Sequence, residues 1–512
     1  MRIHLILIPS VILTSANIYG DWRDSADFPQ LQDYAGASLP DGDGLTVAMT
    51  EAVTLAGYFL PNGSSSVLSN TNIVNIDNHP ATGTSSHATN VASRFYGPNN
   101  SLTPSVETAN IRNATDFLSN FLGITGQVRA STEPVMSHAY IFEARGSLTI
   151  DQAAELIKRF DFFSASSEVI NVIGMDNGNS DDIPEGWGAA YNSISVGLTD
   201  GNHSSGGTPA DYENPGRQKP DIVVNETLTS WSTGAISSSS LLLIDKASEQ
   251  SDADAVHPET IKAALLTGAT KEEFPTWSQS STAPLDTTFG AGEVNIFNSY
   301  RIIEQTNSAT GSVFYRGWAR NSVTTEQTRV YTFTTPISNT PLTLSSTLIW
   351  QRPVTETSSG FSTTYSYEDL PNLQLELLDS SNALIQLSDS ALDNVEHIWN
   401  TELQPNTSYS LRVSSSSDSS DFSLAWRVDG VTDIQLLKPD TQLSISRGSS
   451  SVTLSSTNLI ANTLYTVQRS TDLKTWNDIT TFTPVSSTAT FTDTVLPPDD
   501  EKIFYRLKYF LP

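Results

Sequence analysis

The amino-acid sequence predicts an α/β domain with a mostly parallel central sheet, followed by two all-β domains of the sandwich type. Two observations support this fold class. Between about residues 40 and 306, short apolar strands alternate with helical segments, which is typical of parallel strands joined by crossover helices. From about residue 308 helical periodicity stops, and short strands rich in Thr, Ser, Val and Leu alternate with turn residues.

Composition sets the first limits on function. The chain of 512 residues is long enough for about three domains. It carries 27 Lys and Arg against 56 Asp and Glu, a formal net charge of −29. Such a surface repels nucleic acids and anionic membranes, so we expect neither as a partner. The chain has no cysteine, which excludes disulfides, thiolate metal sites and a cysteine nucleophile.

The first twenty residues are typical of a signal peptide. A weakly basic start precedes an apolar run at residues 5–13, which is too short to span a bilayer permanently. Small residues follow, so cleavage is expected after Ala16 or Gly20; the alternative is a buried first strand. No other run approaches transmembrane length. We therefore expect an exported bacterial protein, extracellular or periplasmic, and an irregular segment from residue 21 to about residue 40.

Residues 42–53 are expected to form a turn followed by a buried strand, and this strand ends on a carboxylate, Glu51. The carboxyl ends of parallel strands carry the functional site in open α/β sheets, so Glu51 is a candidate site residue. The alternative is a solvated residue at the end of a strand.

A helix is expected to begin near His87, because Gly and Ser precede it and apolar residues then recur at helical spacing. His87 would lie in the first turn, facing whatever is above the sheet. A lone histidine is more often structural, and that alternative stays open here.

Six further segments continue the alternation. They are strands at 135–141, 169–175, 193–198 and 219–224 and helices at 150–163 and 258–267. The strand at residues 169–175 leads directly to Asp176 and Asn177. The helix at residues 258–267 has proline at its first position.

The turn at residues 228–236 presents Ser230 where an apolar helix starts. Backbone N–H groups in a first helical turn are unpaired, and the helix dipole favours negative charge there. A serine in that position suits a reaction that develops an oxyanion. The alternative is an ordinary N-cap.

The segment after residue 308 contains clear strands at residues 329–333, 373–377, 409–413 and 422–426. A break at residues 430–439 begins a last module of short strands, including residues 464–469. Period-two alternation with frequent turns predicts antiparallel sandwiches.

The order Glu51, His87, Ser230 and the context of each residue resemble the subtilisin-like serine proteases (subtilases, peptidase family S8), whose triad runs Asp, His, Ser. The family patterns V-A-V-x-D-T/S-G, H-G-T-H-V-A-G and G-T-S-x-A-x-P stand here as VAMTEAV, HATNVAS and LTSWSTG. Further patches in the family's order are residues 174–177, 194–200, 219–223, 258–266 and 289–295. The resemblance covers roughly residues 40–306 and implies a three-layer subtilisin-like domain.

The resemblance also implies roles. Ser230 is the nucleophile, His87 the general base, Glu51 the carboxylate that orients His87, and Asn177 a donor to the oxyanion. The implied function is that of a secreted serine endopeptidase acting on proteins or peptides, with no cofactor required. The sequence departs from the family at Glu51 in place of Asp, Leu228 in place of Gly, Gly234 in place of Pro and Asn90 in place of the second His.

These inferences give a signal peptide at 1–20, a catalytic domain at 21–306, a β-sandwich at 307–430 that resembles pre-peptidase C-terminal or P-domain modules, and a fibronectin-type-like domain at 431–512. The β-domains are expected to bind a surface or polysaccharide, or to add stability. Structural calcium at Asp181–Asp182 or Asp252–Asp254 is weighed against solvated loops. His138 and His203 are expected to be surface or structural residues. The alternative function is a catalytically impaired subtilase-like protein that attaches to a surface.

Overall fold

The computed structural model describes residues 5–6, 21–68, 71–123, 126–142, 149–180, 183, 186–210, 214–359, 362–429, 442–447, 451–457, 459, 464–470, 477–494 and 503–510. The chain forms two compact units, Met1–Val428 and Asp429–Pro512, each described by itself below. Of the expected signal peptide, only β1 (Leu5–Ile6) is described, and it pairs antiparallel with β6 (Ile141–Phe142). Among the described residues no helix is long and apolar enough to cross a membrane.

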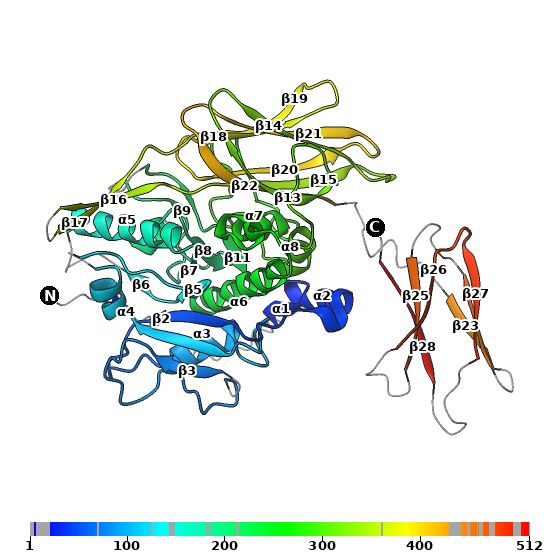
Figure 1. The fold of residues 1–512 in the computed structure, drawn as a ribbon, viewed down its shortest axis with the longest axis horizontal. Coiled ribbons are helices and arrows are strands. Elements are labelled where there is room, and N and C mark those ends of the chain that lie inside the picture. The colour runs from blue at the N-terminus through cyan, green and yellow to red at the C-terminus, as the bar shows by residue number, and fades with distance from the viewer. Residues whose placement is uncertain are drawn as a thin grey trace. The chain divides into compact units, whose positions relative to one another are not determined.

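A seven-stranded sheet forms the centre of the first unit, in the order β11-β8-β7-β5-β2-β4-β3 (Figure 1). Every neighbouring pair in it is parallel, so the predicted parallel sheet is confirmed. Its strands are β2 (Thr46–Glu51), β3 (Asn72–Asn75), β4 (Thr108–Asn113), β5 (Val135–His138), β7 (Ile170–Gly174), β8 (Ile194–Leu198) and β11 (Ile222–Val224).

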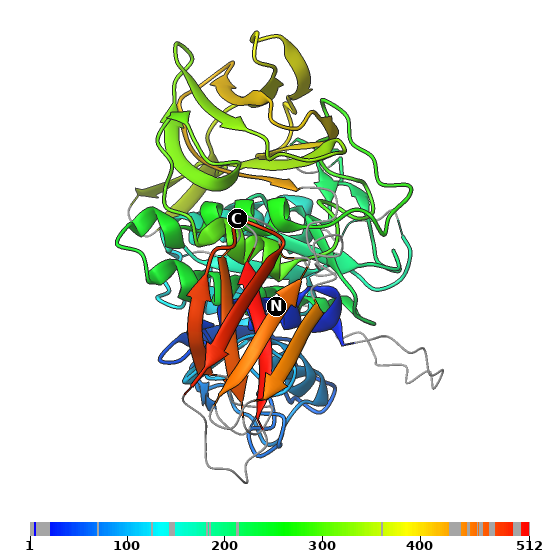
Figure 2. The same cartoon turned by 90° about the vertical axis from the view of Figure 1, so that its right-hand side faces the viewer.

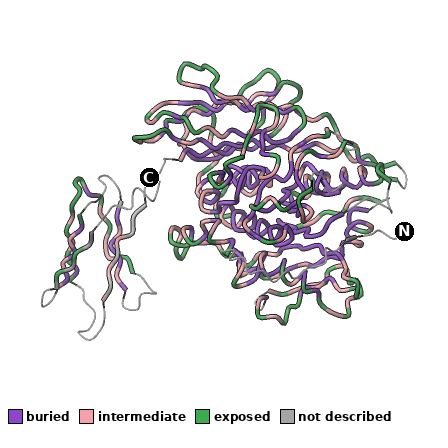
Figure 3. The backbone as a smooth tube through the Cα atoms, turned by 180° about the vertical axis from the view of Figure 1, so that it is seen from behind, coloured by how far each residue is buried: buried purple, intermediate pink, exposed green. Residues whose placement is uncertain are grey.

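Helices cover both faces of this sheet (Figure 1). One apolar core joins the sheet to α3 (Ser86–Phe95), α6 (Thr229–Ser248), α7 (Pro258–Gly268) and α8 (Ile296–Ile303). The other core joins it to α5 (Ile150–Ser166), α4 (Ala114–Asp116) and the short π-helix η2 (Phe117–Phe121). The sheet and α6 are buried over most of their length (Figure 3). The domain therefore has the three layers that the resemblance noted in the sequence implies.

The alternation of side chains along β2 determines on which face of the sheet Glu51 lies. Val47 and Met49 belong to the core beneath α3 and α6, whereas Ala48 belongs to the core beneath α5. Successive side chains of a strand point to opposite faces, so residues 47, 49 and 51 share one face. Glu51, the last residue of β2, thus points to the layer that contains α3.

The expectation of an irregular segment after residue 21 is wrong. The structure has α1 (Trp22–Ser25), α2 (Phe28–Ala35) and the short turn η1 (Gly36–Ser38) there. Phe28 and Leu31 are buried, and the Tyr34 hydroxyl donates to the Glu304 carboxylate, 2.9 Å away at the end of α8. Helices this short gain their stability from tertiary packing, which leaves little periodic signal in the sequence.

The rest of the first unit is an antiparallel β-sandwich, as predicted, apart from one parallel pair of short strands. A four-stranded sheet, β13-β22-β15-β20, faces a five-stranded sheet, β12-β14-β21-β18-β19, across an apolar core. Strand β15 packs against α7, and the sandwich lies next to the helix layer (Figure 2). The strands are β12 (Gly311–Ser312), β13 (Arg316–Val323), β14 (Thr328–Thr334), β15 (Leu342–Ile349), β18 (Leu373–Leu378), β19 (Leu384–Ser388), β20 (Val395–Leu403), β21 (Ser408–Ser415) and β22 (Ser420–Asp429).

A hairpin, β16 (Val354–Ser359) and β17 (Ser362–Tyr367), extends from the sandwich to α5. The Tyr367 hydroxyl donates to Asp161 Oδ2 at 2.5 Å, and an Arg159 nitrogen donates to the Thr363 carbonyl at 3.0 Å. These contacts of buried polar groups tie the sandwich to the α/β layers of the same unit.

The second unit consists of two antiparallel three-stranded sheets, β23-β24-β27 and β26-β25-β28, around a small core that includes Val452, Leu454 and Val467. The strands are β23 (Gln442–Arg447), β24 (Val452–Thr457), β25 (Leu464–Ser470), β26 (Asn477–Phe482), β27 (Thr488–Asp493) and β28 (Phe504–Phe510). The prediction of a final all-β module is confirmed.

Candidate active site

The structure brings Glu51 and His87 into direct contact. His87 Nδ1 and Glu51 Oε2 are 2.9 Å apart, within hydrogen-bond distance. Glu51 is fully buried and His87 is 8% exposed. The Ser85 hydroxyl accepts from the Ala88 N–H and so caps α3, which places His87 in the first turn, above the end of β2. The contact joins the carboxyl end of a strand to the first turn of a helix 36 residues later.

Burial and charge act against each other in this pair. Burial lowers the pKa of His87, but the negative charge of Glu51 and the hydrogen bond outweigh that effect, so the pKa of His87 is raised overall. Burial raises the pKa of Glu51, and the contact with His87 offsets only part of the rise. The pair therefore stabilises a protonated imidazole inside the protein, which is what a general base needs once it has taken a proton.

Ser230 lies in the first turn of α6, which begins at Thr229. Leu228, not Ser230, is the N-cap residue, so the ordinary capping role weighed for Ser230 is wrong. The Ser230 side chain is 7% exposed, and its hydroxyl makes no hydrogen bond with any residue that the structure describes, His87 included. Other α6 serines are engaged: those at positions 237, 239 and 240 donate to carbonyls four residues earlier. Hydrogen bonds to catalytic groups often tighten only when substrate binds.

Asn177 lies beside the start of α6. Its Oδ1 accepts from the Thr229 backbone N–H at 3.0 Å, and the Thr229 hydroxyl lies 3.3 Å from the same oxygen. The side-chain NH₂ is therefore the end that Thr229 does not engage. The Ser230 N–H also has no partner within the described part of the chain. Two donors thus stand near one another at the positive end of a helix dipole.

Helices α3 and α6 cross closely, and a glycine makes this possible. A Cβ placed on Gly234 would lie 2.6 Å from the Val91 carbonyl oxygen and 3.0 Å from Arg94 Cβ. Gly234 stands where the subtilase pattern has proline, yet here it is the residue that lets α6 approach α3. This approach carries His87 toward the α6 N-terminus, where the Trp231 ring centroid is 5.5 Å from that of His87.

Gly234→Ala is expected to destabilise the protein by about 1–3 kcal/mol, because the added methyl group must displace backbone atoms of α3. Urea unfolding followed by circular dichroism measures this change. The matched control is Gly126→Ala, whose added Cβ meets no atom within 4 Å. Equal stabilities for the two variants would contradict the packing described for Gly234.

The two other histidines considered in the sequence have structural partners outside this cluster. His138 is fully buried among Phe117 and Phe160, and its Nε2 is 2.9 Å from Asn171 Oδ1. Burial lowers the pKa of His138 to about 4, so it stays neutral. His203 is also buried: its Nδ1 accepts from the Leu198 N–H at 3.0 Å, and its Nε2 is 2.9 Å from a carbonyl oxygen.

Of the two acidic segments considered as calcium sites, the structure describes only residues 252–254. Asp181 and Asp182 lie outside the described residues. Asp254 pairs with Arg320 at 3.2 Å, and Asn307 donates to Asp252 Oδ2 at 3.1 Å. Among the described residues, no group of three or more His, Asp or Glu side chains is arranged to hold a metal ion.

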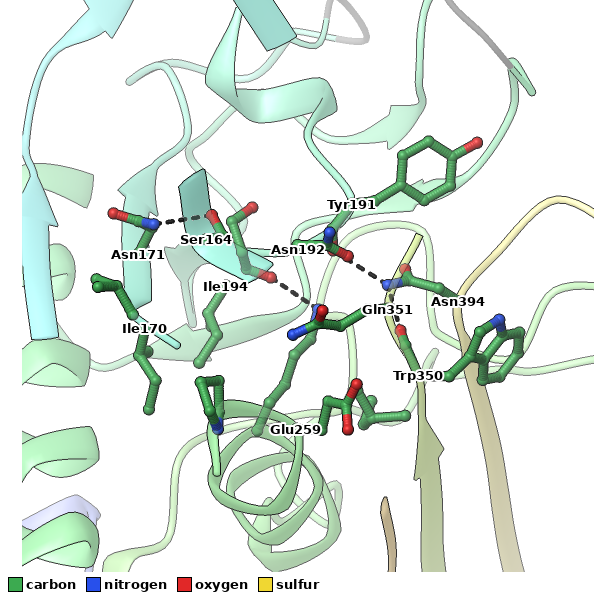
Figure 4. A pocket seen from close by; sticks show the side chains of 15 residues that line it. Ser164, Ile170, Asn171, Tyr191, Asn192, Ile194, Glu259, Trp350, Gln351 and Asn394 are labelled. Carbon is green, nitrogen blue, oxygen red and sulfur yellow. Dashed lines mark hydrogen bonds between the residues drawn. The ribbon is translucent and has the colours of Figure 1, made fainter. Parts of the chain in front are cut away.

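A cavity of about 30 Å³ lies at the opposite edge of the sheet, lined by the amino ends of β7 and β8 and by residues from the sandwich (Figure 4). Its walls are bridged by hydrogen bonds, such as Lys262 Nζ to the Ser193 carbonyl at 2.7 Å and Asn394 Nδ2 to the Trp350 carbonyl at 2.7 Å. Its volume exceeds the roughly 10–15 Å³ that a cavity needs to hold one water molecule, so it can contain ordered water.

The site also contains three residues to which the sequence analysis assigned no role. Trp231 contacts His87, the Arg94 guanidinium carbon is 5.0 Å from the Trp231 ring centroid, and Arg94 Nε donates to Glu226 Oε1 at 2.8 Å. A tryptophan directly after the serine is visible in the sequence, but its contact with His87 depends on the crossing of α3 and α6. Asn90, in contrast, is exposed and donates to the Ser86 carbonyl of its own helix.

No protein-family model matches the chain, and no curated protein does either. Among solved structures, tripeptidyl peptidase 2 is 9% identical with a TM-score of 0.30, and the alignment covers 75% of this chain and 43% of that one. Fervidolysin from Fervidobacterium pennivorans, described as a keratinolytic enzyme related to subtilisin, is 12% identical with a TM-score of 0.37 over 99% of this chain and 75% of its own. The chain thus spans less than half the length of the first of these. We infer no activity from likenesses this distant.

Proposed function

We propose that the chain is a secreted serine endopeptidase of the subtilisin-like type, with Ser230 as nucleophile, His87 as general base and Glu51 as the orienting carboxylate. The observation that carries the proposal is the buried hydrogen bond between His87 Nδ1 and Glu51 Oε2, at the sheet edge where α6 also begins. A glutamate is one methylene longer than the family's aspartate, and this longer side chain reaches the imidazole at a normal hydrogen-bond distance of 2.9 Å.

In this reaction Ser230 Oγ attacks the carbonyl carbon of a peptide bond while His87 Nε2 takes the hydroxyl proton. The negative charge moves to the carbonyl oxygen, where the Asn177 NH₂ and the Ser230 N–H are the donors of the site. The C–N bond then breaks as His87 gives its proton to the leaving amine. Water hydrolyses the acyl-enzyme by the same steps, and Ser230 regains its proton.

Two features of the molecule support the assignment of these roles. Ser230 is the α6 serine whose hydroxyl has no hydrogen bond among the described residues, whereas Ser237, Ser239 and Ser240 donate within the helix and Ser238 accepts from the Leu102 N–H. Asn177 is held by its oxygen, so its donor end is the one left for a ligand. No step needs a metal or an organic cofactor, and the β-domains are proposed as accessory modules that attach to a surface or polysaccharide.

A fluorophosphonate probe tests the proposal. The serine oxygen attacks phosphorus, the P–F bond breaks, fluoride leaves, and His87 takes the proton. We expect the wild-type protein to gain one phosphonyl group, located on Ser230 by mass spectrometry of the labelled peptide. Ser232→Ala, a change two residues along the same helix, should label equally well.

Absence of labelling in a folded wild-type protein, or labelling at a different serine, would reject the peptidase. The first result would favour the alternative function, a catalytically impaired subtilase-like protein that attaches to a surface. One feature of the structure favours this alternative: His87 is bonded to Glu51, but the Ser230 hydroxyl makes no hydrogen bond to His87.

A further inference from the structure

The residue after the proposed nucleophile, Trp231, packs against His87. The two ring centroids are 5.5 Å apart and the ring planes are inclined by 35°. The indole is only 9% exposed. The hydrogen bond that His87 Nδ1 donates to Glu51 holds one edge of the imidazole, whereas the indole contacts the ring itself. The imidazole is thus restrained from two directions by residues of β2 and α6.

Arg94 holds the indole in this position. It follows His87 by seven residues, about two turns, so both side chains lie on the same face of α3. The guanidinium carbon is 5.0 Å from the Trp231 ring centroid, and Nε donates to Glu226 Oε1 at 2.8 Å. Glu226 belongs to the short connection between β11 and α6. Trp231 therefore contacts α3 at both His87 and Arg94.

The charges around the imidazole determine what the indole adds. Glu51 at the end of β2 faces the imidazole directly. Arg94 lies on α3, the helix that also carries His87, and its charge is paired with Glu226, which precedes α6. The face of an indole attracts a cation, and the effect grows when the pair is removed from water. An imidazolium formed on His87 would be such a cation, and the surrounding residues leave only 8% of His87 exposed to solvent.

We propose that Trp231 is a positioning residue for His87, whose indole fixes the plane of the imidazole and stabilises its protonated form. The inference rests on the catalytic role proposed for His87, but its primary readout does not require turnover. Removing the ring while keeping the fold should weaken the imidazolium without touching Ser230 or Glu51.

The test is an NMR titration of protein with ¹³C-labelled histidine, in wild type, Trp231→Phe and Trp231→Leu, with the His87 signal assigned by its loss in His87→Gln. Phe and Leu both leave space, but only Phe keeps an aromatic ring. We expect the pKa of His87 to fall by roughly half a unit in the Leu variant, and by less in the Phe variant. This shift corresponds to a cation–π contribution of about 0.5–1 kcal/mol at 1.36 kcal/mol per pKa unit.

Trp277→Leu is the control, because it removes an indole near Lys271 and should leave the His87 titration unchanged. If Trp231→Leu does not fold, Trp231→Met, which also lacks a ring, takes its place in the comparison with Phe. A His87 pKa that is unchanged or raised in the folded Phe and Leu (or Met) variants would overturn the inference, even if thermal stability fell. A packing role alone predicts such a result, because burial lowers this pKa and loss of the indole exposes the imidazole.

The NMR titration tests the role of Trp231 whether or not the protein proves to be a peptidase. If wild type hydrolyses peptides, the acid limb of its kcat/KM profile should shift to lower pH in the Leu variant, in step with the NMR titration. If wild type hydrolyses nothing and fluorophosphonate fails to label it, the peptidase is rejected, while the titration still decides whether Trp231 stabilises the protonated imidazole.

Discussion

Ser230→Ala is expected to lower kcat for peptide hydrolysis by roughly 10⁶-fold, the scale of loss when the nucleophile of such a triad is removed. The change deletes the Oγ that attacks the carbonyl and leaves His87 and Glu51 with nothing to deprotonate. The variant should fold normally, because the Ser230 hydroxyl makes no hydrogen bond within the described residues. Hydrolysis of a fluorogenic peptide library by purified protein, beside thermal unfolding, measures both outcomes.

Ser232→Ala is the matched control for this prediction. Ser232 lies on the same helix and is fully buried, and its hydroxyl lies 3.5 Å from the Leu228 carbonyl oxygen. Its loss should leave hydrolysis within a few-fold of wild type. If hydrolysis survives Ser230→Ala, Ser230 is not the nucleophile and the site must be assigned anew.

Glu51→Gln is expected to lower kcat by roughly 10⁴-fold, since an amide cannot stabilise the imidazolium and presents the wrong partner to the imidazole tautomer. The isosteric amide keeps the volume of the side chain, so the loss reports on charge rather than packing. Steady-state kinetics of wild type and variant across pH provide the measurement.

The direction in which the pH–rate profile shifts is a second, independent test of the role of Glu51. Glu51 raises the pKa of His87, so the wild-type rate is lost as pH falls through that raised value and His87 becomes protonated before substrate reacts. In Glu51→Gln the charge is gone and the pKa of His87 falls. The acid limb should therefore move to lower pH, although the plateau is far lower than in wild type.

Glu51→Asp is the second variant of this series. It retains the charge but shortens the reach by one methylene, so its loss should be smaller than that of the Gln variant. A Gln variant that keeps more than a tenth of wild-type activity would show that Glu51 does not serve the imidazole in catalysis.

Local sequence signals placed most elements close to where the structure has them. The strand expected within residues 42–53 is β2, and the helix expected near His87 starts at residue 86. Apolar runs bounded by Gly, Ser and Pro carry this information, because strand and helix ends are decided largely by nearby residues. Helices α1 and α2 were missed, since helices this short are stabilised by tertiary packing, such as that of α2 on α8, rather than by their own periodicity.

The identity of the helix cap shows a second limit. A serine near the start of a helix is by propensity an N-cap, yet Leu228 takes that position and Ser230 lies two residues inside. The side-chain oxygen Oδ1 of Asn177 accepts from the Thr229 N–H, which a capping side chain would otherwise serve. A partner 52 residues away in the chain thus replaces the local cap, and no local pattern reveals it.

The sequence by itself determined the order of the three candidate groups and their placement at strand ends and helix starts, because those depend on short-range patterns. Only the tertiary structure decided that Glu51 reaches His87 and that Trp231 packs against the imidazole. Both contacts require β2 and α6 to converge on α3, which the strand order and the close approach at Gly234 bring about. Such contacts depend on ångström-scale packing between segments far apart in the chain, and this packing cannot be predicted from the spacing of residues in the sequence.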